Sequence, residues 1–509
     1  MKSSTAPYFV YFALIAYLLM NTGVVSDDFV DIAQYRNVNF VETLIPTGNF
    51  INVPVAQLSH HMWFRYFSVD DSVVDLFKIG FTVLSFYLIS TFFRLFVARD
   101  TAFLLSFLFI FFPSHDAMPY GYAISGHVLA MALYLYAYCL AQRDRLVLAF
   151  LLALVASFMV YGSTPIAVAL FVLFAVNREI KKAMVMIVPN AIYAAYFIYV
   201  SIIVAVAPSR VLEPVSLTSL AKQFALQVAT FADATVGPSM WLKIYYSFHE
   251  LSPLSWVVGA AVTVLLVKTY REDHERPPRN LVVSLVVLAL CSFAMFSVTG
   301  RYPQLAFNLG NRTTLWGSLL IAYLLVLVRS PRSLKLAAFG IMTFAILGIS
   351  DHWKAWNLHQ QAVIRRIARS QALADYREER EIFVSGNQYS MFGPISHIEF
   401  MSEDWVPQSL FRLTSHERIR ARTINRRFRY MDGALIDSKY GVHIPVNDYI
   451  NVYDSEADRL IRVSVGDINA YVESLREEKR HWSMLGDSRY LELVRKSAVF
   501  LMPRLGGYL

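Results

Sequence analysis

Long apolar stretches separated by short polar breaks recur through the first 350 residues of the chain. A membrane-spanning helix needs about 20 predominantly apolar residues. By that measure the pattern predicts eleven spans, at residues 8–25, 73–94, 101–113, 123–141, 145–161, 164–177, 183–206, 254–269, 281–298, 313–329 and 334–350. The chain is therefore predicted to be a polytopic α-helical membrane protein.

The overall composition agrees with this prediction. Of the 509 residues, 56% are hydrophobic and only 17% are charged, and the mean hydropathy is +0.43. A water-soluble domain of this size carries more charge and fewer apolar residues. The two cysteines, Cys139 and Cys291, both fall inside apolar stretches, so no disulfide is expected.

Basic residues gather in one set of loops, at Lys2 and within residues 94–99, 143–145, 178–182, 268–279 and 329–335. Because basic loops stay in the cytoplasm, the N-terminus is expected there. An odd number of spans then places residues 351–509 outside the cytoplasm. These loops also account for much of the net charge of +8, so no nucleic-acid partner is implied.

The first span has a second interpretation as a signal peptide, with Val24 and Ser26 as the small residues before a cleavage site. In either case the residues that follow lie outside the cytoplasm. The scarcity of cysteines and the compact outer loops favour the inner membrane of a bacterium over an endoplasmic reticulum.

Three outer segments are long. Residues 26–72 and 207–253 mix polar and aromatic positions, which predicts helices lying along the membrane interface. The tail begins with a predicted helix that leads out of the membrane, with Trp353 and Trp356 at the headgroup level. Beyond it, EIFVSG and RLIRVSVGD resemble strands and NAYVESLREEKRHW resembles a helix. We therefore expect a membrane domain over residues 1–350 and a small α/β domain, with its leading helix, over residues 351–509.

An adjacent pair of acids, Asp27 and Asp28, ends the first span in the segment VVSDDFV. Acids at this place are common as solvated helix ends. A carboxylate beside lipid also makes a good general base, because partial desolvation raises its pKa toward neutral pH. The pair is therefore a candidate catalytic site.

Two later loops carry further candidates. The segment FFPSHDAMPYGYAISGHV contains His115 and Asp116, which either cap a tight turn or bind a metal ion or a polar head group. The segment TGRYPQLAFNLGNRTTLWG contains Arg301 and Arg312. An arginine there either extends to the lipid headgroups or binds phosphate through its planar fork.

This layout resembles the GT-C class of integral-membrane glycosyltransferases, which take sugars from polyprenyl-phosphate carriers. The resemblance rests on the acid pair after the first span, the long outer loops, the late outer arginine and the outer C-terminal domain. It implies that Asp27 is the general base ahead of Asp28, and that Asp116 is the second acidic position. It also implies that Arg312, with Arg301 as its substitute, binds the donor phosphate.

The implied reaction is an inverting transfer. Asp27 removes a proton from an acceptor hydroxyl, the oxygen attacks the anomeric carbon, and the lipid phosphate leaves. Arg312 offsets the charge of the leaving phosphate, and His115 or a divalent cation, Mg²⁺ or Mn²⁺, is an optional aid. The expected partners are a polyprenyl-phosphate-linked sugar, an extracytoplasmic acceptor (glycan, glycolipid or protein) and membrane lipid.

Three other classes remain open. An O-antigen ligase or polymerase also uses polyprenyl-linked sugars and outer arginines, but typically lacks the acid pair. A lipid-linked sugar transporter would need a polar path through the membrane, and the predicted spans contain almost no ionisable residues. A scaffold for envelope assembly would use the tail as a binding module.

Overall fold

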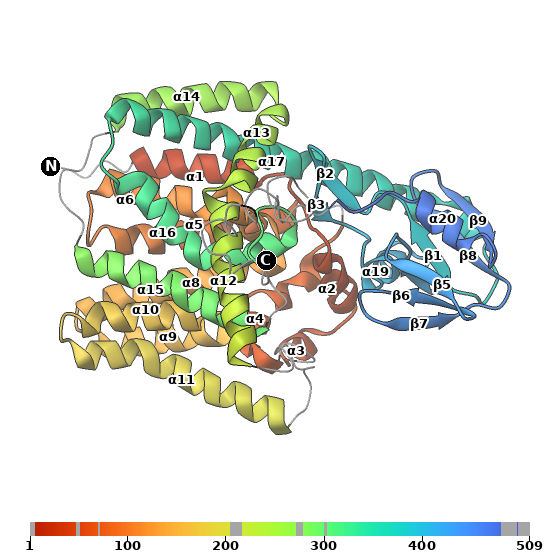
Figure 1. Ribbon diagram of the computed structural model, residues 1–509, viewed down its shortest axis with the longest axis horizontal. Helices are drawn as coiled ribbons and strands as arrows, with labels where there is room; N and C mark the ends of the chain where they lie inside the picture. The colour runs from red at the N-terminus through yellow and green to blue at the C-terminus, as the bar shows by residue number, and fades with distance from the viewer. Residues whose placement is uncertain are drawn as a thin grey trace.

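The computed structural model describes residues 6–46, 51–69, 72–203, 216–270, 278–299, 303–479 and Lys496. A bundle of helices forms one part of the molecule and a smaller domain of mixed strands and helices forms the other (Figure 1). We call the end of the bundle that contacts this smaller domain the domain-facing end.

A helix occupies each of the eleven apolar segments: α1 (Ala6–Leu19), α5 (Val73–Phe93), α6 (Arg99–Ile110), α8 (Tyr122–Gln142), α9 (Leu146–Met159), α10 (Thr164–Ala175), α11 (Ile180–Ile203), α14 (Pro253–Thr269), α15 (Arg279–Thr299), α16 (Leu315–Leu327) and α17 (Arg332–Arg369). The polytopic helical membrane fold is therefore confirmed.

The count of eleven spans is not confirmed. Within the described residues, five helices are long and apolar enough to cross a membrane, or six if a bent pair is one span. The reason is length: α9 has 14 residues and α10 has 12, which extend only about 21 and 18 Å at 1.5 Å per residue. Both are shorter than a hydrocarbon core of about 30 Å.

The long helix α17 joins the two parts of the molecule (Figure 1). Its 38 residues extend about 57 Å, so it runs through the bundle and on along the smaller domain, as predicted. The boundary expected between residues 350 and 351 falls inside this helix. Trp353 on this helix is buried inside the protein.

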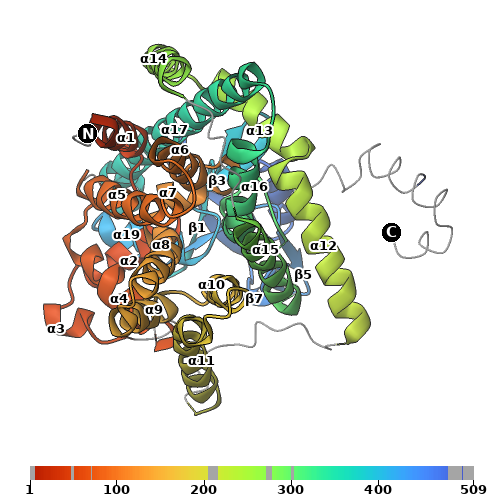
Figure 2. The same cartoon turned by 90° about the vertical axis from the view of Figure 1, so that its left-hand side faces the viewer.

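The first long loop forms short helical segments at the domain-facing end: α2 (Asp27–Tyr35), α3 (Phe40–Thr43), α4 (Pro54–Ser59) and the 3-10 helix η2 (His61–Tyr66). The second forms two longer helices, α12 (Leu217–Thr235) and α13 (Pro238–His249). Viewed along the bundle, α12 crosses the neighbouring helices steeply (Figure 2). A bend of 117° separates the segment Leu217–His249 from α14.

The described residues of the smaller domain form three sheets. The largest has the strand order β4 (Ala421–Thr423), β1 (Ile382–Ser385), β8 (Tyr449–Asp454), β9 (Arg459–Ser464), in which β1 is parallel to β4 and β8, and β9 is antiparallel to β8. The three-stranded sheet is antiparallel and comprises β5 (Phe428–Met431), β6 (Ala434–Asp437) and β7 (Val442–Pro445). Strands β1 and β9 lie where the sequence predicts them, and helix α20 (Ile468–Ser474) begins at the predicted place but is shorter than predicted.

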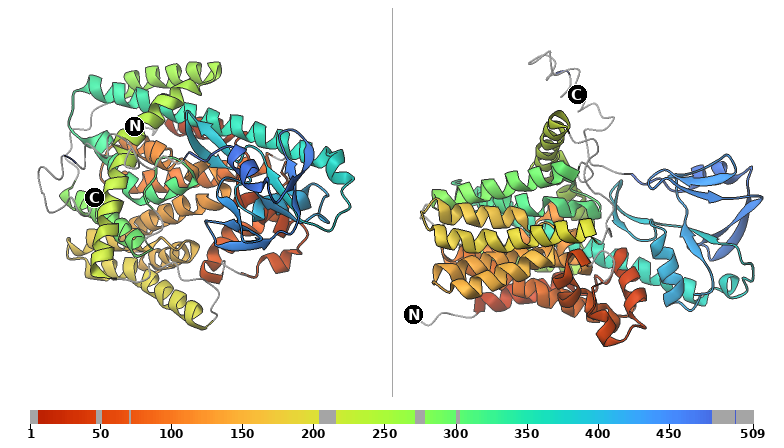
Figure 3. Two further views of the ribbon diagram at one scale, coloured as in Figure 1. Left: turned by 45° about the vertical axis from the view of Figure 1, so that its right-hand side comes forward. Right: turned by 90° about the horizontal axis from the view of Figure 1, so that it is seen from below.

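A β-hairpin and a helix attach this domain to the bundle. The hairpin consists of β2 (Tyr389–Phe392) and β3 (Ile395–Glu399), and its Phe392, Ile395 and Ile398 belong to the hydrophobic core of the bundle. Helix α19 (Trp405–Leu413) packs against α2, where Val406 and Leu410 share a buried cluster with Phe29. The two parts therefore meet through buried apolar side chains. Figure 3 shows the smaller domain against one end of the bundle.

Candidate functional site

The turn that leads into α2 is fixed by a buried ion pair on α5. The Asp75 carboxylate accepts the backbone N–H groups of Asn21 at 2.7 Å and Gly23 at 3.0 Å. Lys78, which lies 2.9 Å from Asp75, donates to the Thr22 hydroxyl at 2.6 Å. Both charged groups are almost fully buried. The turn is therefore held by bonds to Asp75 and to Lys78.

Asp28 follows this turn, and its carboxylate bonds to the backbone of the protein itself. Its carboxylate accepts the backbone N–H of Val25 at 3.1 Å and that of Ala123, at the start of α8, at 3.0 Å. The side chain is buried, and it is not among the residues that line the pocket of Asp27 described below. Burial raises its pKa to about 6. Asp28 therefore links α2 to α8.

Asp27 is exposed and lines an open pocket of about 320 Å³ between the bundle and the smaller domain. The indole N–H of Trp405 donates to its carboxylate at 2.8 Å. Because the carboxyl lies in a recess surrounded by protein, desolvation raises its pKa, and the Trp405 bond and the charge of Arg312 only partly oppose this. A carboxylate with a raised pKa and free access to solvent is suited to accept a proton.

Arg312 lies on the wall of the same pocket, in the 3-10 helix η4 (Leu309–Thr314). Its neighbours anchor this helix: Thr313 donates to the Pro303 carbonyl at 3.1 Å and Thr314 to the Ser114 carbonyl at 2.9 Å. Arg312 itself is exposed. Among the described residues, no carboxylate lies within ion-pair distance of its guanidinium group. The pocket therefore presents a cation that is open to an anionic ligand.

Asp116 is fully buried elsewhere. Its carboxylate accepts bonds from four side chains on four different elements: Lys243, Asn311, Trp353 and His397. Lys243 lies 2.7 Å away and His397 lies 2.8 Å away. Although burial alone would raise its pKa, Lys243 and His397 hold the pKa of Asp116 well below its usual range. Asp116 does not line the pocket.

The Asp116 cluster fixes the pocket wall indirectly. His397 accepts the backbone N–H of Asn308 through Nδ1 at 3.1 Å, so its Nε2–H donates to Asp116. Asn308 and Arg312 belong to one segment, and Asn311 between them is bonded to Asp116. Asp116 therefore secures the segment that carries Arg312.

The remaining predicted residues are not brought to the pocket. His115 is buried, with its ring centroid 5.5 Å from that of Phe109, and burial lowers its pKa to about 4. Arg301 lies outside the described residues. Of the six residues named from the sequence, the structure thus unites Asp27 and Arg312 in one pocket. Asp28, Asp116 and His115 are buried and do not line that pocket.

The smaller domain supplies pocket residues that the sequence did not suggest. They are Glu399 at the end of β3, Glu403, Trp405 at the start of α19, and Lys439 and Tyr440 between β6 and β7. No local motif marks them, because they reach Asp27 only when the domain docks on α2.

Within the described residues, no group of three or more His, Cys, Asp or Glu side chains is arranged to hold a metal ion. The acids of the pocket, Asp27, Glu399 and Glu403, line it together without forming such a group.

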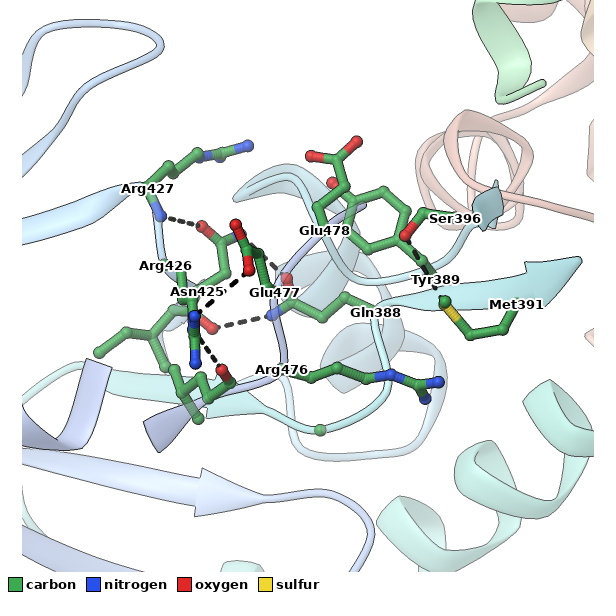
Figure 4. A pocket seen from close by; sticks show the side chains of 13 residues that line it. Gln388, Tyr389, Met391, Ser396, Asn425, Arg426, Arg427, Arg476, Glu477 and Glu478 are labelled. Carbon is green, nitrogen blue, oxygen red and sulfur yellow. Dashed lines mark hydrogen bonds and ion pairs between the residues drawn. The ribbon is translucent and has the colours of Figure 1, made fainter. Parts of the chain in front are cut away.

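A second, smaller pocket of about 60 Å³ lies within the smaller domain (Figure 4). Its arginines are already engaged: Arg426 donates to the Leu475 carbonyl at 2.6 Å and lies 3.5 Å from Glu477, and Arg427 lies 3.1 Å from both Glu403 and Asp437. These bonds tie strands and loops of the domain together. This pocket is therefore better explained as part of the domain's framework than as a ligand site.

No protein-family model matches this chain, and no curated protein matches it. Among solved structures, the crystal structure of ArnT from Cupriavidus metallidurans bound to undecaprenyl phosphate is similar to it. The similarity covers 83% of this chain and 86% of that chain, with 11% sequence identity and a TM-score of 0.44. The case for a function therefore depends on the pocket.

Proposed function

We propose that this protein is an inverting membrane glycosyltransferase, which moves a sugar from a polyprenyl-phosphate carrier to an extracytoplasmic acceptor. The observation that carries the proposal is that Asp27 and Arg312 line one open pocket. One group is suited to accept a proton and the other to bind a phosphate. These are the two tasks that transfer from a phosphate-linked sugar requires.

In the proposed reaction, an acceptor hydroxyl donates its proton to the Asp27 carboxylate as its oxygen attacks the anomeric carbon of the donor sugar. The bond from that carbon to the phosphate oxygen breaks on the opposite face, and the polyprenyl phosphate leaves with the bonding electron pair. Arg312 pairs with the phosphate as its negative charge grows. The products are the glycosylated acceptor and polyprenyl phosphate.

Two further features support this assignment. The Trp405 N–H binds one oxygen of Asp27, which leaves the other oxygen for a proton. The pocket lies at the domain-facing end of the bundle, where a lipid-linked donor can place its sugar while its chain stays in the bilayer. The proposal places the N-terminus in the cytoplasm and the smaller domain outside, in the inner membrane of a bacterium.

Asp116 and Asp28 have supporting roles in the proposal. Asp116 holds the segment of Arg312 through Asn311 and His397, and Asp28 holds α2 through Ala123. Neither touches the substrate. His115 is assigned no part in binding the phosphate, and Arg301 remains the proposed substitute for Arg312.

The test uses a deletion strain of the native host complemented with wild-type protein or with Asp27→Asn. Mass spectrometry would measure the surface glycans and the polyprenyl-phosphate-linked sugars. The proposal predicts that one sugar is missing in the deletion and in Asp27→Asn, while its lipid donor accumulates. Asp375→Asn, an exposed acid of the smaller domain outside the pocket, should restore the normal pattern.

The same experiment separates the alternatives. If the protein is a ligase or polymerase that depends on arginine alone, Asp27→Asn would restore the normal glycans in the deletion strain. A transporter would leave its lipid-linked substrate on the cytoplasmic side of the membrane in the deletion. Either result would overturn the proposal.

A further inference from the structure

Two large aromatic side chains of the smaller domain line the pocket and are exposed to solvent. Trp405 is 41% exposed and Tyr440 is 48% exposed, although the domain has a well-packed core. Their ring centroids lie 5.9 Å apart, with the planes tilted by 57°. Both line the pocket that contains Asp27. Large aromatic faces left open beside a polar recess are typical of a binding surface.

The position of this aromatic pair is tied to the proposed base. Trp405 bonds to the Asp27 carboxylate through its indole N–H, so its ring face stays free for a ligand. Any group that packs on this ring lies within a few ångströms of Asp27. The aromatic pair is therefore placed to hold the acceptor, whose hydroxyl must reach Asp27.

Glu399 adds a polar group on the same wall. Among the described residues, no side chain or backbone group bonds to its carboxyl. Desolvation and the nearby acids Glu403, Glu478 and Asp27 raise the pKa of Glu399 to about 7, against the opposing charge of Lys439. Near neutral pH this carboxyl is available both to accept and to donate a hydrogen bond.

Glu403 differs from Glu399, although both line the pocket. It pairs with Lys439 and, at 3.1 Å, with Arg427. The Lys439 ammonium and the Arg427 guanidinium both lie against the Tyr440 ring, at 5.0 and 5.4 Å from its centroid. Glu403 therefore fixes the position of Tyr440, and Glu399 is left free for a ligand.

We propose that the acceptor is a carbohydrate, whose ring packs against Trp405 and Tyr440 and whose hydroxyl groups bond to Glu399. This inference rests on the proposed function, because it brings one further hydroxyl of that ring to Asp27. A sugar ring has an apolar C–H face and a polar edge, which match the aromatic pair and the carboxyl. A serine or threonine of a polypeptide acceptor would reach Asp27 without using the aromatic surface.

Saturation-transfer NMR on the purified full chain in nanodiscs tests this proposal. The probes are the methyl glycosides of glucose, galactose, mannose and N-acetylglucosamine, with a serine-containing hexapeptide as the competing class. We expect wild-type protein to saturate the ring protons of at least one glycoside and not the peptide. Saturation of none of the glycosides, or of the peptide alone, would overturn the proposal.

Variants locate the binding. Trp405→Ala is expected to weaken glycoside binding by about tenfold, which corresponds to about 1.4 kcal/mol, because the ligand loses one aromatic ring to pack on. Trp405→Phe retains a ring and should keep most of the binding. Trp241→Ala removes another exposed tryptophan, on α13 outside the pocket, and should change nothing. Equal effects of Trp405→Ala and Trp241→Ala would contradict the assignment.

The binding experiment and the test of the proposed function can give opposite results, because the binding experiment needs no transfer. If Asp27→Asn abolishes transfer but the glycosides do not bind at Trp405, the function stands and the carbohydrate acceptor is wrong. If the glycosides bind but Asp27→Asn restores the normal glycans, the pocket binds sugar and the transferase mechanism is wrong.

Discussion

Asp27 and Asp116 both lie at the domain-facing end of the bundle, but the fold surrounds them differently. Asp27 is exposed, accepts one bond from Trp405, and has a raised pKa. Asp116 is enclosed, accepts bonds from four side chains, and has a lowered pKa. A carboxylate whose lone pairs are all occupied cannot take a proton from a substrate. Access and unused bonding capacity therefore distinguish the proposed base, Asp27, from the structural acid, Asp116.

The largest expected effect is on the rate of transfer. Asp27→Asn keeps the size of the side chain and removes the base, so kcat should fall by about 10²- to 10⁴-fold. The thermal midpoint in detergent should stay close to that of the wild type, because the carboxylate makes only one side-chain bond. Rates would be measured in proteoliposomes with the donor that the glycan analysis identifies. A large fall in the thermal midpoint would remove the contrast with Asp116.

The next effect is on stability. Asp116→Ala leaves the Lys243 ammonium buried without its partner, which costs about 3–5 kcal/mol. The measured outcome is a lower midpoint of thermal unfolding in detergent and less protein recovered from membranes. The double variant Asp116→Asn with Lys243→Met removes both charges and should recover part of the loss. Asp448→Ala, in the exposed Asp448–Arg380 pair, serves as the control and should change the midpoint little.

Arg312→Ala should slow transfer by about 10²- to 10³-fold, because the phosphate loses its charge partner. Arg312→Lys should recover only part of the rate, since an ammonium group cannot bind two oxygens through a planar fork. Arg418→Ala, an exposed arginine outside the pocket, is the matched control. Equal rates for Arg312→Ala and Arg418→Ala would exclude Arg312 from the site.

The smallest effect concerns pH. The base must be deprotonated, and the pKa of Asp27 is raised, so kcat/KM should rise with pH through an acid limb above the usual value of about 3.9 for aspartate. The Trp405 bond lowers that pKa, so Trp405→Phe should move the limb to higher pH. A Trp241→Phe variant should leave it in place. An acid limb that Trp405→Phe does not move would argue against Asp27 as the titrating group.

Hydrophobic patterning was sufficient to find the apolar helices of the bundle. Every apolar segment became a helix, and α17 leaves the bundle where its amphipathic pattern predicts. The number of spans was less accessible, because the ends of α9 and α10 are set by turns that the pattern does not reveal. Local periodicity therefore predicted which segments are helices better than it predicted how many of them are long enough to span a membrane.

The candidate site was only partly accessible from the sequence. Loop charge put Asp27 and Arg312 on one side of the membrane, and the resemblance to the GT-C class implied their paired roles. The burial of Asp116 and His115 could not be foreseen, since it depends on Lys243 and His397, which are distant in sequence. The role of Trp405 could likewise not be predicted, because its contact with Asp27 is made only when α19 packs on α2.

The central claim is that Asp27 and Arg312 perform different tasks in one pocket. It is tested most directly by purifying Asp27→Asn, Arg312→Ala and wild-type protein from the native membrane and measuring the co-purified polyprenyl-phosphate sugar by mass spectrometry. The account predicts that Asp27→Asn retains at least as much donor as the wild type without transferring it, whereas Arg312→Ala retains little. Loss of donor from Asp27→Asn, or full retention by Arg312→Ala, would contradict the account.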